Sequence, residues 1–284
     1  MTCAMVILIY KDCLRARMLA EKCATYDIIE KIVIVDNCSG DGSFEYLSEI
    51  SNEKIHIMLS DKNGGFGYGN NVGAKYLLEN YNPQYILLAN TDTIFPEENI
   101  VKCIEVLEND SSLGMTSTRM KNPNGEEQKS SWKFASFKEH LLTCFWAYRR
   151  KKYVKAQKTS VTYAQQVVYV DVVRGSFMLF RSEALEKAGF FDENVFLYAE
   201  EVIIASRLQK AGYKAGVMTD VWYIHDHHDV VKTTKGYHSL KRLMKSAYYY
   251  QCNYRNINQF QKMLMSICML WGGFEQKVID IIKS

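Results

Sequence analysis

Four short apolar segments recur through the first ninety residues of the chain, each followed by polar residues. They are MVILI (5–9), KIVIV (31–35), KIHIML (54–59) and YILLA (85–89). Their starts lie about thirty residues apart, which is the length of a strand–helix–strand unit. The pattern therefore predicts four buried strands joined by helices.

Helical spacing of apolar residues fills the gaps between these segments. Helices are expected over 13–26, from Gly42-Ser43 onward, over about 70–80, and from Pro96, which suits a first helical position. Strands that are apolar on both faces and alternate with helices are typical of a parallel sheet covered on both sides. We expect an α/β fold with a mainly parallel sheet flanked by helices on both faces.

The second half of the chain is less regular. Residues 167–180 predict one or two strands, 182–189 a short helix closed by Gly189, and 200–212 an amphipathic helix. Residues 221–229 predict a strand with a His-rich exit, and the chain from Tyr237 onward is helical and aromatic. We expect these C-terminal helices to pack on or beside the main sheet.

Composition changes this picture little. Apolar residues make up 48% of the 284 residues and charged residues 24%, so a large core is expected. With only 3 Pro residues and no linker, we predict one main unit, 1–235, with a donor half (1–115) and an acceptor half (116–235). A helical extension follows over 236–284.

The 8 cysteines form no CxxC pair, and no signal peptide is evident. Free thiols in a reducing cytoplasm are therefore expected. The longest apolar run, 263–271, is about half the ~20 residues that a membrane-spanning helix needs. The sequence does not set an oligomeric state, and no nucleic-acid partner is expected.

Charge is unevenly distributed despite the net charge of +3. Residues 129–158 hold nine Lys or Arg residues against the single acid Glu139, interleaved with aromatic residues. Such a stretch can bind an anionic membrane surface or an acidic acceptor. An ordinary solvated helix face is the alternative.

Polar side chains follow several of the predicted strands, and ligands of parallel sheets bind at this edge. Asp92, with Asn90 as a further oxygen donor, could hold Mg²⁺ or Mn²⁺ against a diphosphate, or could simply cap the next helix. Asp36 could accept a hydrogen bond from a uracil or thymine ring, or belong to an ordinary turn.

Other candidates are ambiguous by themselves. The segment GGFGYGNNVG (64–73) lacks the spacing of a dinucleotide-binding loop, although it follows a strand and precedes a helix. Glu200 and Glu201 are either ordinary first-turn acids or a catalytic pair. His225, His227 and His228 are a poor tetrahedral zinc set, so one His ligand is more credible than three.

Seven segments in order resemble the inverting glycosyltransferases of family 2, closest to a rhamnosyltransferase-like branch with the type A nucleotide-sugar transferase fold. The segments are VDNCSGDGS, NGGFGYGNNVG, LLANTDTIF, VVRGSFMLFRSEAL, GFFDENVFLYAEEV, RLQKAGYK and a His after the next strand. The resemblance covers the chain from Val6 to about Tyr254.

The resemblance implies a role for each matching residue. Asp92 would be the metal-binding carboxylate, Glu201 of the Glu200–Glu201 pair the catalytic base, and His225 a group beside the metal or diphosphate. Gly175 would lie on the acceptor side. The donor-binding residues would be Ile9, Tyr10, Asp36, Asn63, Gly65, Asn70, Asn90 and Asp92.

The implied reaction is an inverting, Mg²⁺- or Mn²⁺-dependent sugar transfer, from dTDP-rhamnose or otherwise a UDP-hexose. The acceptor would be a bacterial polysaccharide or a lipid-linked glycan. The protein would be cytoplasmic, either free or held at the inner membrane face. Two departures are Glu-Glu in place of Glu-Asp and Ile203 at a frequent Asp position. The alternatives are an inactive scaffold and a sugar-phosphate nucleotidyltransferase, while an oxidoreductase would instead bind NAD.

Overall fold

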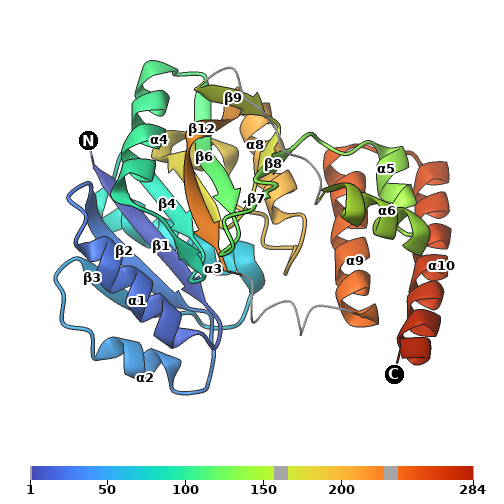
Figure 1. Ribbon diagram of the computed structural model, residues 1–284, viewed down its shortest axis with the longest axis horizontal. Coiled ribbons are helices and arrows are strands. Elements are labelled where there is room, and N and C mark those ends of the chain that lie inside the picture. The colour runs from blue at the N-terminus through green and yellow to red at the C-terminus, as the bar shows by residue number, and fades with distance from the viewer. Residues whose placement is uncertain (1, 157–165, 227–235, 284) are drawn as a thin grey trace.

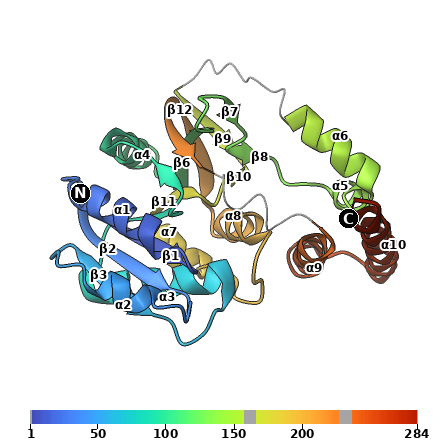
Figure 2. The same cartoon turned by 60° about the horizontal axis from the view of Figure 1, so that its bottom comes forward.

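The computed structural model describes residues 2–156, 166–226 and 236–283. A twisted sheet lies at the centre of one part of the molecule, and a group of helices lies at one end of it (Figures 1 and 2). His227, His228 and Asp229 of the predicted His-rich exit, and Lys158 of the basic segment, lie outside the described residues.

The four strands predicted from the first ninety residues form one parallel half of the sheet, in the order β3-β2-β1-β4. Their bounds are β1 (Cys3–Ile9), β2 (Ile29–Asp36), β3 (Ile55–Leu59) and β4 (Tyr85–Ala89). All four carboxyl ends therefore lie along one edge, which confirms the expected α/β sheet.

The other half of the sheet is mixed. Strand β11 (Phe177–Arg181) pairs antiparallel with both β4 and β6 (Leu113–Lys121), and β12 (Lys214–His225) pairs parallel with β6. Short strands extend this half: β5 (Thr93–Ile94) and β9 (Val167–Val170) on β12, and β7 (Glu127–Gln128) on β6. Since β11 runs against β4, the start of β11 lies beside the end of β4.

Two sequence expectations in this half need correction. Residues 167–180 were expected to form one or two strands, but they contribute to three, because β10 (Val172–Val173) leaves the main sheet and pairs with β8 (Ser131–Trp132). The strand predicted at 221–229 begins at Lys214, since the residues before Val221 pair with β6 and β9.

Alternating side chains of the central strands divide the core between two faces. On β1, Cys3, Met5, Ile7 and Ile9 join one cluster, while Ala4 and Val6 join the other. The first cluster is covered by α1 (Cys13–Ala24), α2 (Ser43–Ser48) and α4 (Glu97–Asn109). The second is covered by α3 (Gly65–Tyr81), α7 (Ser182–Ala188) and α8 (Glu200–Lys210).

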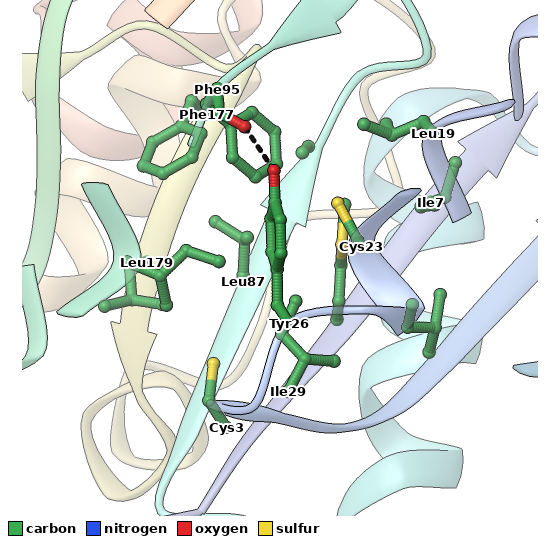
Figure 3. Packing of buried hydrophobic residues seen from close by; sticks show 14 of the residues in the cluster. Cys3, Ile7, Leu19, Cys23, Tyr26, Ile29, Leu87, Phe95, Phe177 and Leu179 are labelled. Carbon is green, nitrogen blue, oxygen red and sulfur yellow. Dashed lines mark hydrogen bonds between the residues drawn. The ribbon is translucent and has the colours of Figure 1, made fainter. Parts of the chain in front are cut away.

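One buried polar contact ties the first helix to the exit of β4. The Tyr26 hydroxyl donates a hydrogen bond to the Phe95 carbonyl at 2.6 Å, between apolar side chains (Figure 3). The Phe95 ring lies edge-on to Phe177 with centroids 4.9 Å apart. Because burial disfavours an unpaired hydroxyl, this bond fixes the path of the chain just after Asp92.

The glycine-rich segment forms the first turns of α3 rather than a loop, so the helix begins five residues before the expected Asn70. A Cβ at Gly69 would lie 2.2 Å from the Leu8 side chain, and one at Gly73 would lie 2.6 Å from Val6. Gly65, Gly69 and Gly73 are four residues apart and share one helix face. The glycines therefore allow α3 to lie close against β1.

The helical group at the end of the molecule consists of α9 (Tyr237–Tyr254) and α10 (Gln259–Lys283) with α5 (Phe137–Leu142) and α6 (Trp146–Ala156) (Figure 2). Its small core contains Cys144, Leu240 and Met244. The expected C-terminal helices are thus present, and α9 packs beside the sheet against α8. Helices α5 and α6 join them from inside the predicted acceptor half.

Candidate functional site

The exits of β4 and β12 and the start of β11 bring several predicted site residues together. The Asn90 amide donates to the Ser176 carbonyl at 3.0 Å, so the end of β4 and the start of β11 are joined. His225 ends β12, and its Nε2 lies 3.0 Å from Asp92 Oδ1. Residues from three distant parts of the sequence therefore form one cluster at the predicted edge.

Asp92 does not cap the following helix. Helix α4 begins at Glu97 with Pro96 at its N-cap position and no side-chain capping bond, and β5 separates Asp92 from it. The Asp92 side chain instead faces His225, and both residues are buried, with exposures of 9% and 4%. The alternative explanation of Asp92 as a cap is therefore wrong.

Glu200 and Glu201 begin α8 at the same edge. The Gly175 amide donates to Glu201 Oε1 at 3.2 Å, and a Cβ at Gly175 would lie 3.2 Å from the Glu201 side chain. Gly175 therefore gives Glu201 both a hydrogen bond and the room to approach the backbone. The Ser176 hydroxyl in turn lies 2.8 Å from the buried Tyr223 hydroxyl, and Tyr223 is on β12, two residues before His225.

The two glutamates differ in their surroundings. Burial, together with the neighbouring Glu201 charge, raises the pKa of Glu200 to about 8; Glu200 Oε2 has no hydrogen-bond partner among the described residues. Burial also raises the pKa of Glu201, but the Arg174 charge and the Gly175 amide oppose that rise. Of the two, Glu201 is therefore the glutamate whose carboxylate form has a nearby cation and an amide donor to favour it.

Strained backbone precedes the glutamates. Tyr198 and Ala199 have φ of +69° and +66°, a left-handed conformation that non-glycine residues seldom adopt. Each such residue costs on the order of 1–3 kcal/mol, and this strain concentrates at functional sites. The chain thus accepts strain where it presents the Glu200–Glu201 pair.

Helix α9 holds the loop that carries this strain. The hydroxyls of Tyr249 and Tyr254 donate to Asp192 Oδ2 at 2.9 and 2.6 Å, and Arg207 lies 3.3 Å away. Burial would raise the pKa of Asp192, but these hydroxyl and amide donors lower it below its ordinary value. Asp192 is therefore an ionised anchor at the start of the loop.

The exits of β1 and β2 form a second, neighbouring group. Asp36 is 1% exposed, and its Oδ1 accepts from the amide and hydroxyl of Ser39 at 3.0 and 2.5 Å. The Ser39 hydroxyl also accepts from the Lys11 amide at 2.8 Å. Ile9 is buried in the core and its carbonyl accepts from the Asn37 amide at 2.9 Å, whereas Tyr10 is exposed.

The predicted donor-binding residues in and beside the glycine-rich segment lie in different surroundings. Asn63 accepts from Asn37 Nδ2 at 3.1 Å and belongs to the strand-end network. Gly65 has φ of +88°, and its Cβ would lie 2.1 Å from the Phe196 carbonyl oxygen, so it joins α3 to the loop before Glu200. Asn70 is buried within α3 and donates to the Phe66 carbonyl at 2.9 Å.

Sequence reasoning missed several contributors. Arg174 supplies the charge beside Glu201, Tyr223 lies between Ser176 and the His225 strand end, and the Thr91 hydroxyl bonds to the Asp12 carboxylate. Arg174 stands directly before Gly175 in a quoted segment, so its position offered a signal. Tyr223 and Asp12 gave none, because only the folded sheet brings them to this edge.

A sequence model of the family described as Glycosyl transferase family 2 matches residues 13–188, more than half of the chain. The chain belongs to glycosyl transferase family 2. The matched part of this family 2 protein contains Asp36, Asp92 and Gly175, whereas Glu200, Glu201 and His225 lie beyond it.

Two curated relatives are similar to this family 2 chain. Rhamnosyltransferase WbbL of Escherichia coli is 28% identical over 170 residues, 58% of this chain and 62% of that protein. The low-salt glycan biosynthesis hexosyltransferase Agl10 of Haloferax volcanii is 25% identical over 198 residues, 70% of this chain and 59% of that protein. The matches thus span about three fifths of each relative's length.

Solved structures show the fold. TarS 1–349 of S. aureus in complex with UDP aligns with a TM-score of 0.57 at 14% identity, covering 95% of this chain and 70% of the TarS 1–349 chain. Mannosyltransferase PcManGT from Pyrobaculum calidifontis, in complex with GDP-Man and Mn²⁺, aligns with the same TM-score and identity over 97% and 73%. The expected type A fold is therefore confirmed.

Proposed function

We propose that this protein transfers a sugar from a nucleoside diphosphate donor to an acceptor hydroxyl, with inversion at the anomeric carbon. The observation that carries the proposal is the cluster at the sheet edge, where the Asp92–His225 pair and the Glu201 carboxylate meet through Gly175, Ser176 and Asn90. Membership of glycosyl transferase family 2 indicates that the reaction at this cluster is a sugar transfer.

The Asp92–His225 pair suits a divalent cation. A carboxylate oxygen and an imidazole nitrogen 3.0 Å apart, both buried, are donors that Mn²⁺ accepts. Such ions in transferases are held by one or two side chains together with substrate phosphates. A Mg²⁺ or Mn²⁺ ion held by Asp92 and His225 supplies positive charge for the leaving diphosphate.

The protein's own residues supply the remaining steps. Glu201, which lies beside the Arg174 charge and is oriented by the Gly175 amide, takes the proton from the acceptor hydroxyl when it is in its carboxylate form. The hydroxyl oxygen attacks the anomeric carbon as its bond to the diphosphate oxygen breaks, so one displacement inverts that centre. Glu200 stays protonated and leaves Glu201 as the base.

For the donor we propose dTDP-rhamnose first and a UDP-hexose second, since one relative is a rhamnosyltransferase and another a hexosyltransferase. Asp36 and the exposed Tyr10, at the ends of β2 and β1, would contact the base. We further propose a polysaccharide or lipid-linked glycan as acceptor, and a cytoplasmic protein held at the inner membrane face.

Turnover with a panel of donors tests the proposal. We expect nucleoside diphosphate release from dTDP-rhamnose or a UDP-hexose with Mn²⁺, accelerated by detergent-solubilised lipid-linked glycans, and a product of inverted configuration by nuclear magnetic resonance. Release of pyrophosphate from a nucleoside triphosphate and a sugar phosphate would instead identify a nucleotidyltransferase. No turnover of any donor, with intact nucleotide binding, would identify a scaffold.

A further inference from the structure

The outer face of α10 is apolar and exposed over its whole length. Helix α10 lies at the outside of the helical group, away from the sheet (Figures 1 and 2). Its large exposed apolar side chains have exposures from 40% to 78%. They are Phe260, Met263, Ile267, Leu270, Trp271, Phe274, Val278, Ile281 and Ile282.

The spacing of these residues places them on one stripe. At about 100° per residue, the nine side chains fall within a sector of about 120°. The opposite face of α10 is the packed one: Met265 is buried, and a Cβ at Gly272 would lie 2.2 Å from the Cys144 carbonyl oxygen. Helix α10 is therefore apolar on two faces, of which the helical group covers only one.

The helical group that carries this stripe is basic. Residues 137–156 and 236–283 of the helical group contain thirteen Lys or Arg residues and three acidic ones. Helix α6 packs along one border of the stripe, where Glu275 accepts from the Trp146 amide at 2.5 Å and lies 3.9 Å from Arg149. Exposed Arg150 and Lys151 follow on α6, and exposed Lys277 belongs to α10 itself.

We propose that the α10 stripe lies in the surface of an anionic lipid bilayer, with the helix parallel to the membrane plane. Contiguous exposed apolar surface of this extent marks an interaction site. An amphipathic helix with Trp and Phe on one face and basic residues beside it binds at the interface between lipid headgroups and acyl chains. Anionic lipids attract the cations of the helical group.

Charge decides between this occupant and a second copy of the chain. Two copies joined through α10 would bring two strongly basic helical groups together, whereas an anionic surface complements them. Within the part of the chain that the structure describes, no helix is long and apolar enough to cross a membrane. The contact is therefore made along the surface.

This inference deepens the proposed function, because it names the surface that would bring the site to a lipid-linked acceptor. The membrane contact nevertheless needs neither donor nor turnover. Binding to vesicles in the absence of nucleotide therefore tests it separately from sugar transfer.

Vesicle flotation with the full-length protein tests the contact. We expect binding to phosphatidylglycerol-containing vesicles, at least tenfold weaker binding to pure phosphatidylcholine, and weakening by salt. Trp271 emission should shift to the blue on binding, and brominated lipids should quench it. Trp271→Phe should keep the binding while losing most of that signal.

The double variant L270E/W271E should lose at least tenfold in vesicle binding. The side chains are 76% and 56% exposed, so an unchanged circular dichroism melting curve checks the fold. The control is L14E/M18E, which changes two side chains of α1 that are 62% and 71% exposed, and should bind as wild type.

Two results would overturn the proposal. One is unchanged vesicle binding by L270E/W271E. The other is absence of vesicle binding by the wild type together with a dimer, seen by light scattering, that the same variant dissociates, because the stripe would then belong to a second copy.

Discussion

Polar side chains of a folded protein usually face water, and apolar side chains usually face the core. The strand-end cluster departs from this rule because its polar groups are buried, and the α10 stripe departs from it because its apolar groups are exposed. At the sheet edge, buried Asp92, His225 and Glu201 are held by specific partners. On α10, large apolar side chains are exposed along the outer face of the helix. Buried polarity here points to chemistry, and exposed apolarity to a surface contact.

The comparison also shows that the two regions are physically linked. Helix α9 packs against α10 on one side and, through Tyr249 and Tyr254, holds Asp192 at the start of the loop that leads to Glu200. The element that anchors the catalytic loop therefore also supports the outer helix. A change in α9 would disturb both regions, whereas changes at Glu201 or Leu270 separate them.

The largest expected effect is on turnover at Glu201. Glu201→Gln removes the base but keeps an oxygen for the Gly175 amide, so we expect transfer to fall by about 10²- to 10⁴-fold with donor binding retained. Initial rates of nucleoside diphosphate release measure the loss. The control is Glu183→Gln, an exposed first-turn acid of α7, which should keep full activity. Equal losses in both variants would contradict the role of Glu201.

A substitution at Gly65 should destabilise the fold, because Gly65 joins α3 to the loop before Glu200. Gly65→Ala places a Cβ 2.1 Å from the Phe196 carbonyl oxygen at φ of +88°, so we expect the free energy of unfolding to fall by about 3–5 kcal/mol. Gly125→Ala is the matched control, with φ of +82° and no atom within 4 Å, and should cost about 1–2 kcal/mol. Denaturant titration compares them; equal costs would show that the Phe196 contact is unimportant.

A smaller effect is expected from Gly175→Ala. The new Cβ would lie 3.2 Å from Glu201, which must shift by a few tenths of an ångström, so we expect kcat to fall by about tenfold with the donor KM unchanged. Gly216→Ala is equally crowded, at 3.2 Å from Val167, but is not among the site residues. It should lower stability while leaving kcat intact, and a reversed pattern would contradict the positioning of Glu201 by Gly175.

A further expected effect is a pH dependence of stability that is spread over several pH units. Glu200 has a pKa of about 8 in the folded protein against 4.5 ordinarily, so between these values the folded state binds more protons. The free energy of unfolding therefore falls as pH rises through this window, by up to about 1.4 kcal/mol per unit. Glu200→Gln should flatten this slope in melting curves recorded from pH 5 to 8. An unchanged slope would show that Glu200 is ionised when folded.

Much of the fold followed from local patterns, because apolar segments and turn residues determine strands such as Tyr85–Ala89 directly. The glycine-rich segment was misassigned, since the need for Gly69 and Gly73 arises from contacts with β1 that are distant in sequence. The three-strand division of 167–180 likewise depends on pairing with β8, β12 and β4.

Individual site residues could be predicted where their position within one segment of the sequence indicated a role. Asp92 stood at a strand end and Glu201 at a helix start, but their meeting required β11 to run antiparallel beside β4. Arg174 and Tyr223 gain their roles only from that arrangement, through proximity to Glu201 and Ser176. The division into a donor half, an acceptor half and a C-terminal extension stays a prediction. Helices α5 and α6, from the acceptor half, pack with the C-terminal helices.

Calorimetric titration of dTDP and UDP into wild type and Asp92→Asn, with and without Mn²⁺, tests the central claim most directly. The account predicts that Mn²⁺ tightens binding of one nucleotide to wild type by at least about tenfold, or 1.4 kcal/mol, and that Asp92→Asn removes this gain. Asp110→Asn, on a loop away from the strand ends, should behave as wild type. Mn²⁺-dependent binding that survives Asp92→Asn would contradict the assignment of Asp92 as the metal-binding carboxylate.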